Sequence, residues 1–260
     1  MELKEKLVSS FIAFENQISL DNTFVHDMRT EAIKRFESEG FPAKKDEAWK
    51  YTSLKKVLKQ DFSVFAKKEF AVEYKDVQPY FIHDIDSYKI VFVDGKYASH
   101  LSETTHEGID ICLMSAALSQ PKYRLVIENY FNKTAEKNSL TSLNTAFTNE
   151  GAYIHITKNK LVEKPIQIIH FSTGSEAALL LQPRNLIVVD ENAHVQIIER
   201  HQSLTDNPTL TNCVTEIFAD KRAIVDYYKV QNDKENASLI DSTFIDQKRE
   251  SHVSVHTFSF

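Results

Sequence analysis

Few side chains in this chain of 260 residues could bind a metal ion or act as a nucleophile. Its two cysteines, Cys112 and Cys213, lie far apart in the sequence and form no Cys-x-x-Cys pair. A structural zinc site takes about four ligands at close spacing, and two distant thiols do not supply them. Free cysteine is among the most buried residue types. We therefore predict that both cysteines are buried free thiols.

Histidines offer two further groups. His252 and His256 share one face of a predicted strand, but four residues at about 3.3 Å each place them roughly 13 Å apart. They cannot chelate one ion together, and the sequence does not identify a partner on a neighbouring strand, so we expect solvated side chains. The run Glu199, Arg200 and His201 is typical of a charged surface turn. The sequence thus predicts no metal site, and cofactor-binding residues stay unknown.

Catalytic motifs are missing from the sequence. It contains no Gly-x-x-x-x-Gly-Lys-Ser/Thr loop for a nucleotide, no Gly-x-Ser-x-Gly elbow and no His-Glu-x-x-His pair. The sequence therefore predicts no catalytic residue and a protein that is not an enzyme. Any ATP hydrolysis connected with its function must belong to a partner.

Composition narrows the class of protein. The formal net charge of −6 argues against binding to nucleic acid or to an anionic membrane surface. The hydrophobic content of 42% is enough for a sizeable core. The charged start "MELKEKLVSS" is unlike a signal peptide, and no window approaches the roughly 18 apolar residues that span a bilayer. We expect a cytoplasmic protein.

The elements that must position these side chains fall into three predicted regions. Residues 1–88 show apolar stripes at helical spacing, which predict two helices, with Gly40 and Pro42 ending the second. Trp49 and Tyr51, just after this turn, are expected to anchor it by packing. Residues 89–148 form a mixed α/β connecting segment, with a hairpin predicted at Asp94-Gly95 and two short helices.

Residues 149–260 change to short runs of alternating apolar residues, which predict β-strands. No helical stripe interrupts them, so a sandwich, a barrel and a β-solenoid remain open. Two pieces are similar to each other: "NLIVVDENAHVQIIERH" and "CVTEIFADKRAIVDYYKVQ". Each predicts a strand, a short corner that begins at Asp190 or Asp220, and a second strand. This weak repeat favours the solenoid.

The sequence resembles the SufB/SufD family of iron–sulfur cluster assembly proteins over essentially its whole length. "GFPAKKDEAWKYTSLKKVL" matches the family's Gly-Phe-Pro and Lys-x-Glu-x-Trp-Lys/Arg-Tyr-Thr-x-Leu pattern, and is closer to the SufD branch than to the SufB branch. "LNTAFTNEGAYIHITKNKLVEKPIQIIHFS" resembles the entry to the family core, and the two repeated pieces resemble its successive rungs. The resemblance implies a mainly β fold, a right-handed parallel β-helix preceded by helices.

The resemblance also implies a function and partners. Members are scaffold subunits that work with SufB and the ATPase SufC to build clusters and pass them to other proteins. We therefore expect no cofactor on this chain alone, since a cluster normally takes about four thiolates, and a cluster only transiently in the full complex. The alternatives are a β-helix enzyme acting on polysaccharides and a purely structural interaction module.

The resemblance implies that family members are usually longer, and we expect this sequence to lack their C-terminal rungs and C-terminal helical domain. Cluster-forming residues of that part cannot be assigned here. An uncovered last rung, "VSVHTFSF", would present an open sheet edge without Pro, Gly, Lys or Arg. We expect this edge to allow a homodimer.

Overall fold

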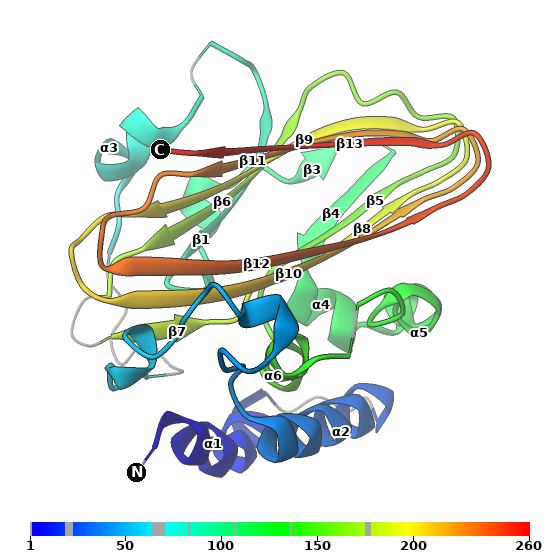
Figure 1. Cartoon of the computed structure of the whole chain (residues 1–260). Helices are drawn as coiled ribbons and strands as arrows, with labels where there is room; N and C mark the ends of the chain where they lie inside the picture. Colours follow the sequence, from blue (N-terminus) through cyan, green and yellow to red (C-terminus); the bar gives the residue numbers. More distant parts are fainter. Residues whose placement is uncertain are drawn as a thin grey trace.

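The computed structural model describes residues 2–18, 23–63, 71–82, 84–106, 108–135, 137–174 and 178–260. Two β-sheets face each other, and the chain passes from one to the other at each turn (Figure 1). Successive strands of each sheet pair in parallel over residues 152–260. The result is a parallel β-solenoid of about three turns preceded by helices, as the sequence predicted.

Each sheet is named here by a central strand. The β9 sheet has the order β13 (His252–Ser259), β11 (Ile224–Gln231), β9 (His194–Ser203), β6 (Ile166–Ser172), β1 (Tyr88–Val93) and β2 (Lys96–Tyr97). The β10 sheet has the order β12 (Ala237–Gln247), β10 (Thr209–Ala219), β8 (Arg184–Val189), β5 (Ala152–Ile156), β4 (Ile109–Leu113) and β3 (Thr105–His106). A short strand, β7 (Leu179–Leu181), pairs with β10.

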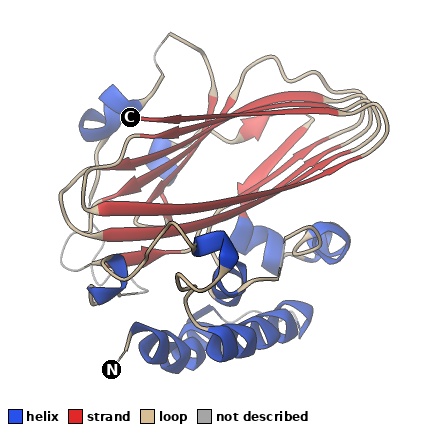
Figure 2. Ribbon diagram, in the orientation of Figure 1, coloured by secondary structure: helices blue, strands red, loops and turns tan. Residues whose placement is uncertain are grey.

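Most helices lie on the outer face of the β10 sheet (Figure 2). They are α1 (Leu3–Ile18), α2 (Thr23–Glu39), α4 (Met114–Ser119), α5 (Arg124–Tyr130) and α6 (Ser139–Ala146). A smaller cluster with α3 (Tyr74–Val77) covers the outer face of the β9 sheet. The helices η1 to η5 are short 3₁₀ turns, at Glu47–Trp49, Val57–Lys59, Gln78–Tyr80, Ser99–Leu101 and Pro121–Tyr123.

The first two helices follow from their apolar stripes. Leu7, Phe11 and Phe14 of α1 are buried against α2, α6 and the strands β7 and β10. Gly40 has φ +69°, and its amide donates to the Phe36 carbonyl at 2.8 Å, which ends α2 as expected.

The predicted packing anchor after this turn is wrong for Tyr51. That side chain is 90% exposed, and Trp49 lies half-buried at the end of η1. The three-residue 3₁₀ turn presents too little surface to cover two large rings. The substitution Trp49→Ala should therefore cost less than the about 3–5 kcal/mol that is usual for a fully buried aromatic.

The hairpin at Asp94-Gly95 is confirmed, with positive φ at both residues and β1 antiparallel to β2. β1 also pairs in parallel with β6, and β4 pairs antiparallel with β5. Strands from the connecting segment thus extend both solenoid sheets. The three-region division, with boundaries at residues 88 and 148, stays a prediction.

The space between the sheets has an apolar half and a polar half. Residues that alternate along the strands point inward, and near the corners they are mainly isoleucine, valine and alanine. Farther along the same strands the inward positions carry histidine, glutamate, cysteine, asparagine, tyrosine, lysine and aspartate. This polar half is the candidate site.

Candidate functional site in the solenoid interior

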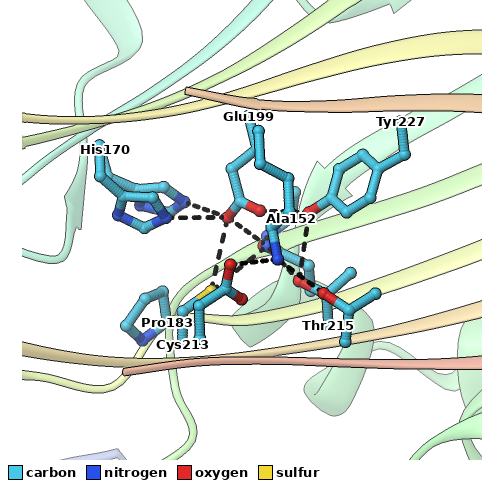
Figure 3. A network of polar contacts seen from close by, with 12 residues as sticks. Ala152, His170, Pro183, Glu199, Cys213, Thr215 and Tyr227 are labelled. Carbon is cyan, nitrogen blue, oxygen red and sulfur yellow. Dashed lines mark hydrogen bonds and ion pairs between the residues drawn. The ribbon is translucent and has the colours of Figure 1, made fainter. Parts of the chain in front are cut away.

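The Glu199 carboxylate is the centre of the polar half (Figure 3). It is fully buried, and its Oε1 accepts a hydrogen bond from Asn185 Nδ2 at 2.9 Å. The Cys213 thiol donates to the same oxygen at 3.4 Å, and the Tyr227 hydroxyl donates to Oε2. Buried charge is tolerated only where such partners surround it. The network therefore fixes an ionised carboxylate between the two sheets.

Two histidines face this carboxylate from the β9 sheet. His170 on β6 and His201 on β9 are partners in register, and their rings stack with centroids 4.7 Å apart and planes 10° from parallel. Each Nε2 lies 3.3 Å from Glu199 Oε1. Phe92 stacks on the other side of His170 at 5.1 Å. The column of three rings holds both imidazoles in one orientation.

The opposite wall ties the carboxylate to the backbone of the β10 sheet. Asn185 Oδ1 on β8 accepts from the backbone amide of Ala152 at 2.9 Å. Its Nδ2 also donates to Thr215 Oγ1 at 3.2 Å. Both sheets therefore contribute to one continuous polar network.

A second charge pair continues the polar half toward the last described rung. Lys229 on β11 is in register with Glu199, and its buried ammonium forms an ion pair with Asp241 on β12, whose side chain is 20% exposed. The same ammonium donates to Thr243 Oγ1 at 2.6 Å. Lys229 therefore balances one of the two carboxylates near it.

Burial and charge shift the titration of the central groups. Burial disfavours the charged form of Glu199, but His170 and His201 beside it outweigh this and hold the pKa of the carboxyl well below its usual value. Burial works against protonation of His201, yet Glu199 raises the pKa of that imidazole. For His170 burial dominates, and the pKa is lowered. Any proton shared by the two rings belongs on His201.

Cys213 is not an activated nucleophile in this setting. Burial, followed by the charges of Glu199 and Asp241, raises the pKa of the thiol well above its usual value. Reactive cysteines need the opposite, an electropositive and partly exposed environment. The thiol therefore acts here as a neutral hydrogen-bond donor.

Two cavities border the network. One of about 560 Å³ lies between the β1–β2 hairpin and the loops around Gly151 and Pro183, and His170 is part of its lining. Another of about 450 Å³ is lined by His201, Lys229 and Asp241 together with residues of β13. The two histidines thus border different hollows.

The prediction of a surface turn at Glu199, Arg200 and His201 is wrong. All three lie inside β9, where Glu199 and His201 point into the interior and Arg200 donates from the outer face to the Tyr80 carbonyl at 2.9 Å. The run of charged residues is typical of a corner, but β9 is ten residues long and includes all three of them. Period-two alternation was the signal that could have placed Glu199 and His201 on one face.

The other predicted groups stay apart from this site, with the exception of Cys213. His252 and His256 are exposed on β13, as expected, and lie in register with Ile224 and Tyr228 of β11. The His256 ring stacks on Tyr228 at 5.2 Å. Cys213 is buried as predicted, whereas Cys112 is only half-buried, against the α4–α5 cluster.

Among the described residues no helix is long and apolar enough to cross a membrane.

Comparison with known proteins assigns both parts of the chain. Residues 1–168 match the SufBD protein N-terminal region, and residues 169–260 match the SufBD core domain of SUF system FeS cluster assembly. An iron–sulfur cluster assembly SufBD family protein of Synechocystis is 26% identical over 219 residues, which are 81% of this chain and 48% of that protein.

Two relatives are named iron–sulfur cluster assembly protein SufD. The one from Bacillus subtilis is 32% identical over 41% of this chain and 25% of its own length. The one from Escherichia coli is 24% identical over 64% of this chain and 37% of its own length. The chain thus spans about half or less of the length of these relatives.

Proposed function

Because the chain belongs to the SufBD family of iron–sulfur cluster assembly proteins, we propose that it is a SufD-like scaffold subunit that works in a complex with SufB and SufC. The observation that carries this proposal is the family match, in which an N-terminal region and a core follow each other and together span residues 1–260. The solenoid supports a scaffold role, since stacked rungs present rigid, extended faces to partners.

In this proposal the chain is not itself an enzyme. A cluster would be held only transiently, at a site that needs the assembled complex, and ATP hydrolysis would be the task of SufC. The place of action would be the cytoplasm.

Two acidic residues on the solenoid surface do not favour the alternative of a polysaccharide-active enzyme. Glu191 and Asp246 lie at its corners, where they pair with Lys158 and Lys248 at 2.6 and 2.9 Å. Carboxylates that serve glycoside hydrolysis flank a substrate groove instead. A purely structural module remains the competing proposal, and the test below separates it from a scaffold.

Affinity purification through a tag on this protein, co-expressed with SufB and SufC, tests the proposal. We expect both partners to be retained, and acid-labile sulfide and iron to accumulate in the complex. The matched control is the SufB–SufC preparation made without this chain, which should yield less cluster. Retention of partners with unchanged cluster yield would favour a structural module. Retention of neither partner would contradict the proposal.

A further inference from the structure

The two histidines and the glutamate at the centre of the network have the composition of a metal site. We propose that His170, Glu199 and His201 bind one divalent first-row transition-metal ion through two imidazole nitrogens and one carboxylate oxygen. Two histidines and one carboxylate are a recurrent ligand set for Fe²⁺ and Zn²⁺. The site stands on its own geometry and does not rest on the proposed function.

The nitrogen–oxygen distances suit such an ion. One ligand atom from each side chain lies within 4.8 Å of the other two, and each Nε2 is 3.3 Å from Glu199 Oε1. Charge-assisted hydrogen bonds between nitrogen and oxygen are shorter, about 2.7–2.9 Å. Bonds of about 2.0–2.1 Å to a tetrahedral metal place neighbouring ligand atoms about 3.3–3.4 Å apart. The spacing of nitrogen and oxygen here is that of coordination.

The nitrogen atoms also lack other partners. Within the described part of the chain, Nε2 of His170 and Nε2 of His201 are buried and make no hydrogen bond of acceptable geometry. The side chains themselves are 8% and 6% exposed. Leaving buried polar atoms unsatisfied costs about 1–3 kcal/mol each. A metal ion between them and Glu199 would satisfy both at once.

Charge balance points the same way. Among the described residues, the carboxylate of Glu199 and the partly exposed carboxylate of Asp241 lie near one ammonium in this half of the solenoid, that of Lys229, which pairs directly with Asp241. Cys213 and Tyr227 donate neutral hydrogen bonds to Glu199. One negative charge is left for the histidines to balance, either by a proton or by a bound cation. The cavity that reaches His170 gives such a cation a route to the site.

Metal titration of the purified chain tests the proposal. The chain is stripped with a chelator and titrated with Co²⁺, with Zn²⁺, and with Fe²⁺ under anaerobic conditions. We expect one equivalent of metal to bind. Bound Co²⁺ should show visible absorption bands that indicate a low coordination number, and added metal should raise the melting temperature of the protein. The readout is metal binding, so it does not depend on any activity of the SUF complex.

The variants His170→Phe and His201→Phe remove one nitrogen each while keeping a flat ring in the column with Phe92. Each should weaken binding by more than about 100-fold, because even the loss of second-shell partners costs 10–100-fold. Glu199→Gln should also weaken binding, and the two Phe variants still test the site if Glu199→Gln does not fold. The matched control is His194→Asn, because His194 lies on β9 like Glu199 and His201 but pairs with Asp226 near the surface.

Three outcomes would overturn the site: no bound equivalent in the parent chain, equal affinity in His170→Phe and His194→Asn, or a melting temperature that metal raises equally in all variants. Failure of the SufB and SufC co-purification with intact metal binding would count against the proposed function and leave the metal site standing.

Discussion

The charged residues buried outside the solenoid interior connect the helices to the β10 sheet. Arg184 on β8 and Glu216 on β10 form an ion pair at 2.6 Å, and both side chains are fully buried. Glu216 also accepts from the backbone amides of Asn132 and Thr134, at 2.8 and 3.0 Å. Burial opposes its ionisation, but Arg184 outweighs this and lowers the pKa of the carboxyl.

Glu216→Gln should therefore destabilise the protein by about 3–5 kcal/mol, because Arg184 keeps a buried charge without its partner. Urea unfolding at pH 7 measures this loss. Glu191→Gln, which weakens ion pairs with the solvent-accessible side chains of Lys158 and Arg222, is the control and should change stability far less. Since the folded-state pKa of Glu216 is lowered, the stability that its ionised carboxylate contributes should decrease as the pH falls through that pKa. Equal stability of the two variants would contradict this account.

Glu150, between α6 and β5, behaves in the opposite way. Burial raises the pKa of this carboxyl from 4.5 to about 7, and Ser115 offsets only part of the shift. Because the folded-state pKa lies above the unfolded value, the ionised form costs stability. That cost begins as the pH rises above about 4.5 and is complete above about 7.

Glu150→Gln should therefore stabilise the protein at pH 8 by up to about 3 kcal/mol and should have little effect at pH 4.5. The measurement is the free energy of unfolding of variant and parent at both pH values. A benefit that is the same at both would contradict the expected ionisation.

At the scale of elements, Gly151 decides how α6 leads into the first full rung. Its φ is +142°, and a Cβ at this position would lie 2.0 Å from the backbone oxygen of Arg184. Gly151→Ala should destabilise the protein by at least about 3 kcal/mol, because backbone of β8 would have to move.

Gly108→Ala is the matched control for this substitution. Gly108 also has positive φ, but a Cβ there meets only the flexible end of the Lys160 side chain, at 3.2 Å or more. Its cost should be near the about 1–2 kcal/mol of a left-handed backbone alone. Thermal unfolding measures the stability of both variants. Equal losses of stability would mean that the close approach of Gly151 to the Arg184 backbone does not determine the cost of the substitution.

The stacked corners of the solenoid repeat one backbone device. Each has a residue with positive φ near +60°, and these residues are Asn159, Asn192, Arg222 and Glu250. The amide of one corner donates to a carbonyl in the next, as Asn192 does to Lys221 and Arg222 to Arg249, both at 3.1 Å. Asparagine tolerates this conformation better than glutamate does.

Glu250→Gly should therefore be more stable than Glu250→Ala by about 1 kcal/mol, since both lose the carboxylate but only alanine keeps a Cβ in the left-handed region. Chemical denaturation of the two variants measures the difference. A more stable alanine variant would contradict the role of backbone conformation at this corner.

At the scale of the whole molecule, the two cysteines are separated by a sheet. Cys112 packs with α4 and α5 outside the β10 sheet, whereas Cys213 points into the interior. They cannot share a cluster. Anaerobic reconstitution with iron and sulfide should therefore leave far less than one sulfide-containing cluster per chain, and Cys112→Ser and Cys213→Ser should not change that amount.

Acid-labile sulfide is the readout for this prediction, because iron alone could occupy the proposed site at His170. One cluster per chain that is lost in both serine variants would contradict it. A yield that rises with protein concentration would instead indicate a cluster shared by two chains, which could pool four cysteines.

The sequence by itself determined the order and type of most elements. Helical stripes predicted α1 and α2, Asp94-Gly95 predicted the hairpin, and period-two alternation predicted the strands of residues 152–260, whose arrangement as a parallel β-helix was implied by the family resemblance. These signals are local, since each depends on residues within one element or turn. The resemblance of the whole chain to the SufB/SufD family was the further signal that predicted its family.

Only the tertiary structure decided the candidate site. His170, Glu199 and Cys213 come from three strands, and their meeting depends on the register between β6 and β9 and on the packing of one sheet against the other. A shift of one residue would turn each inward side chain outward. Alternation along the sequence assigns each strand its two faces, but which residues meet across the interior depends on how the corners stack and the sheets pack, and that is a property of the folded chain.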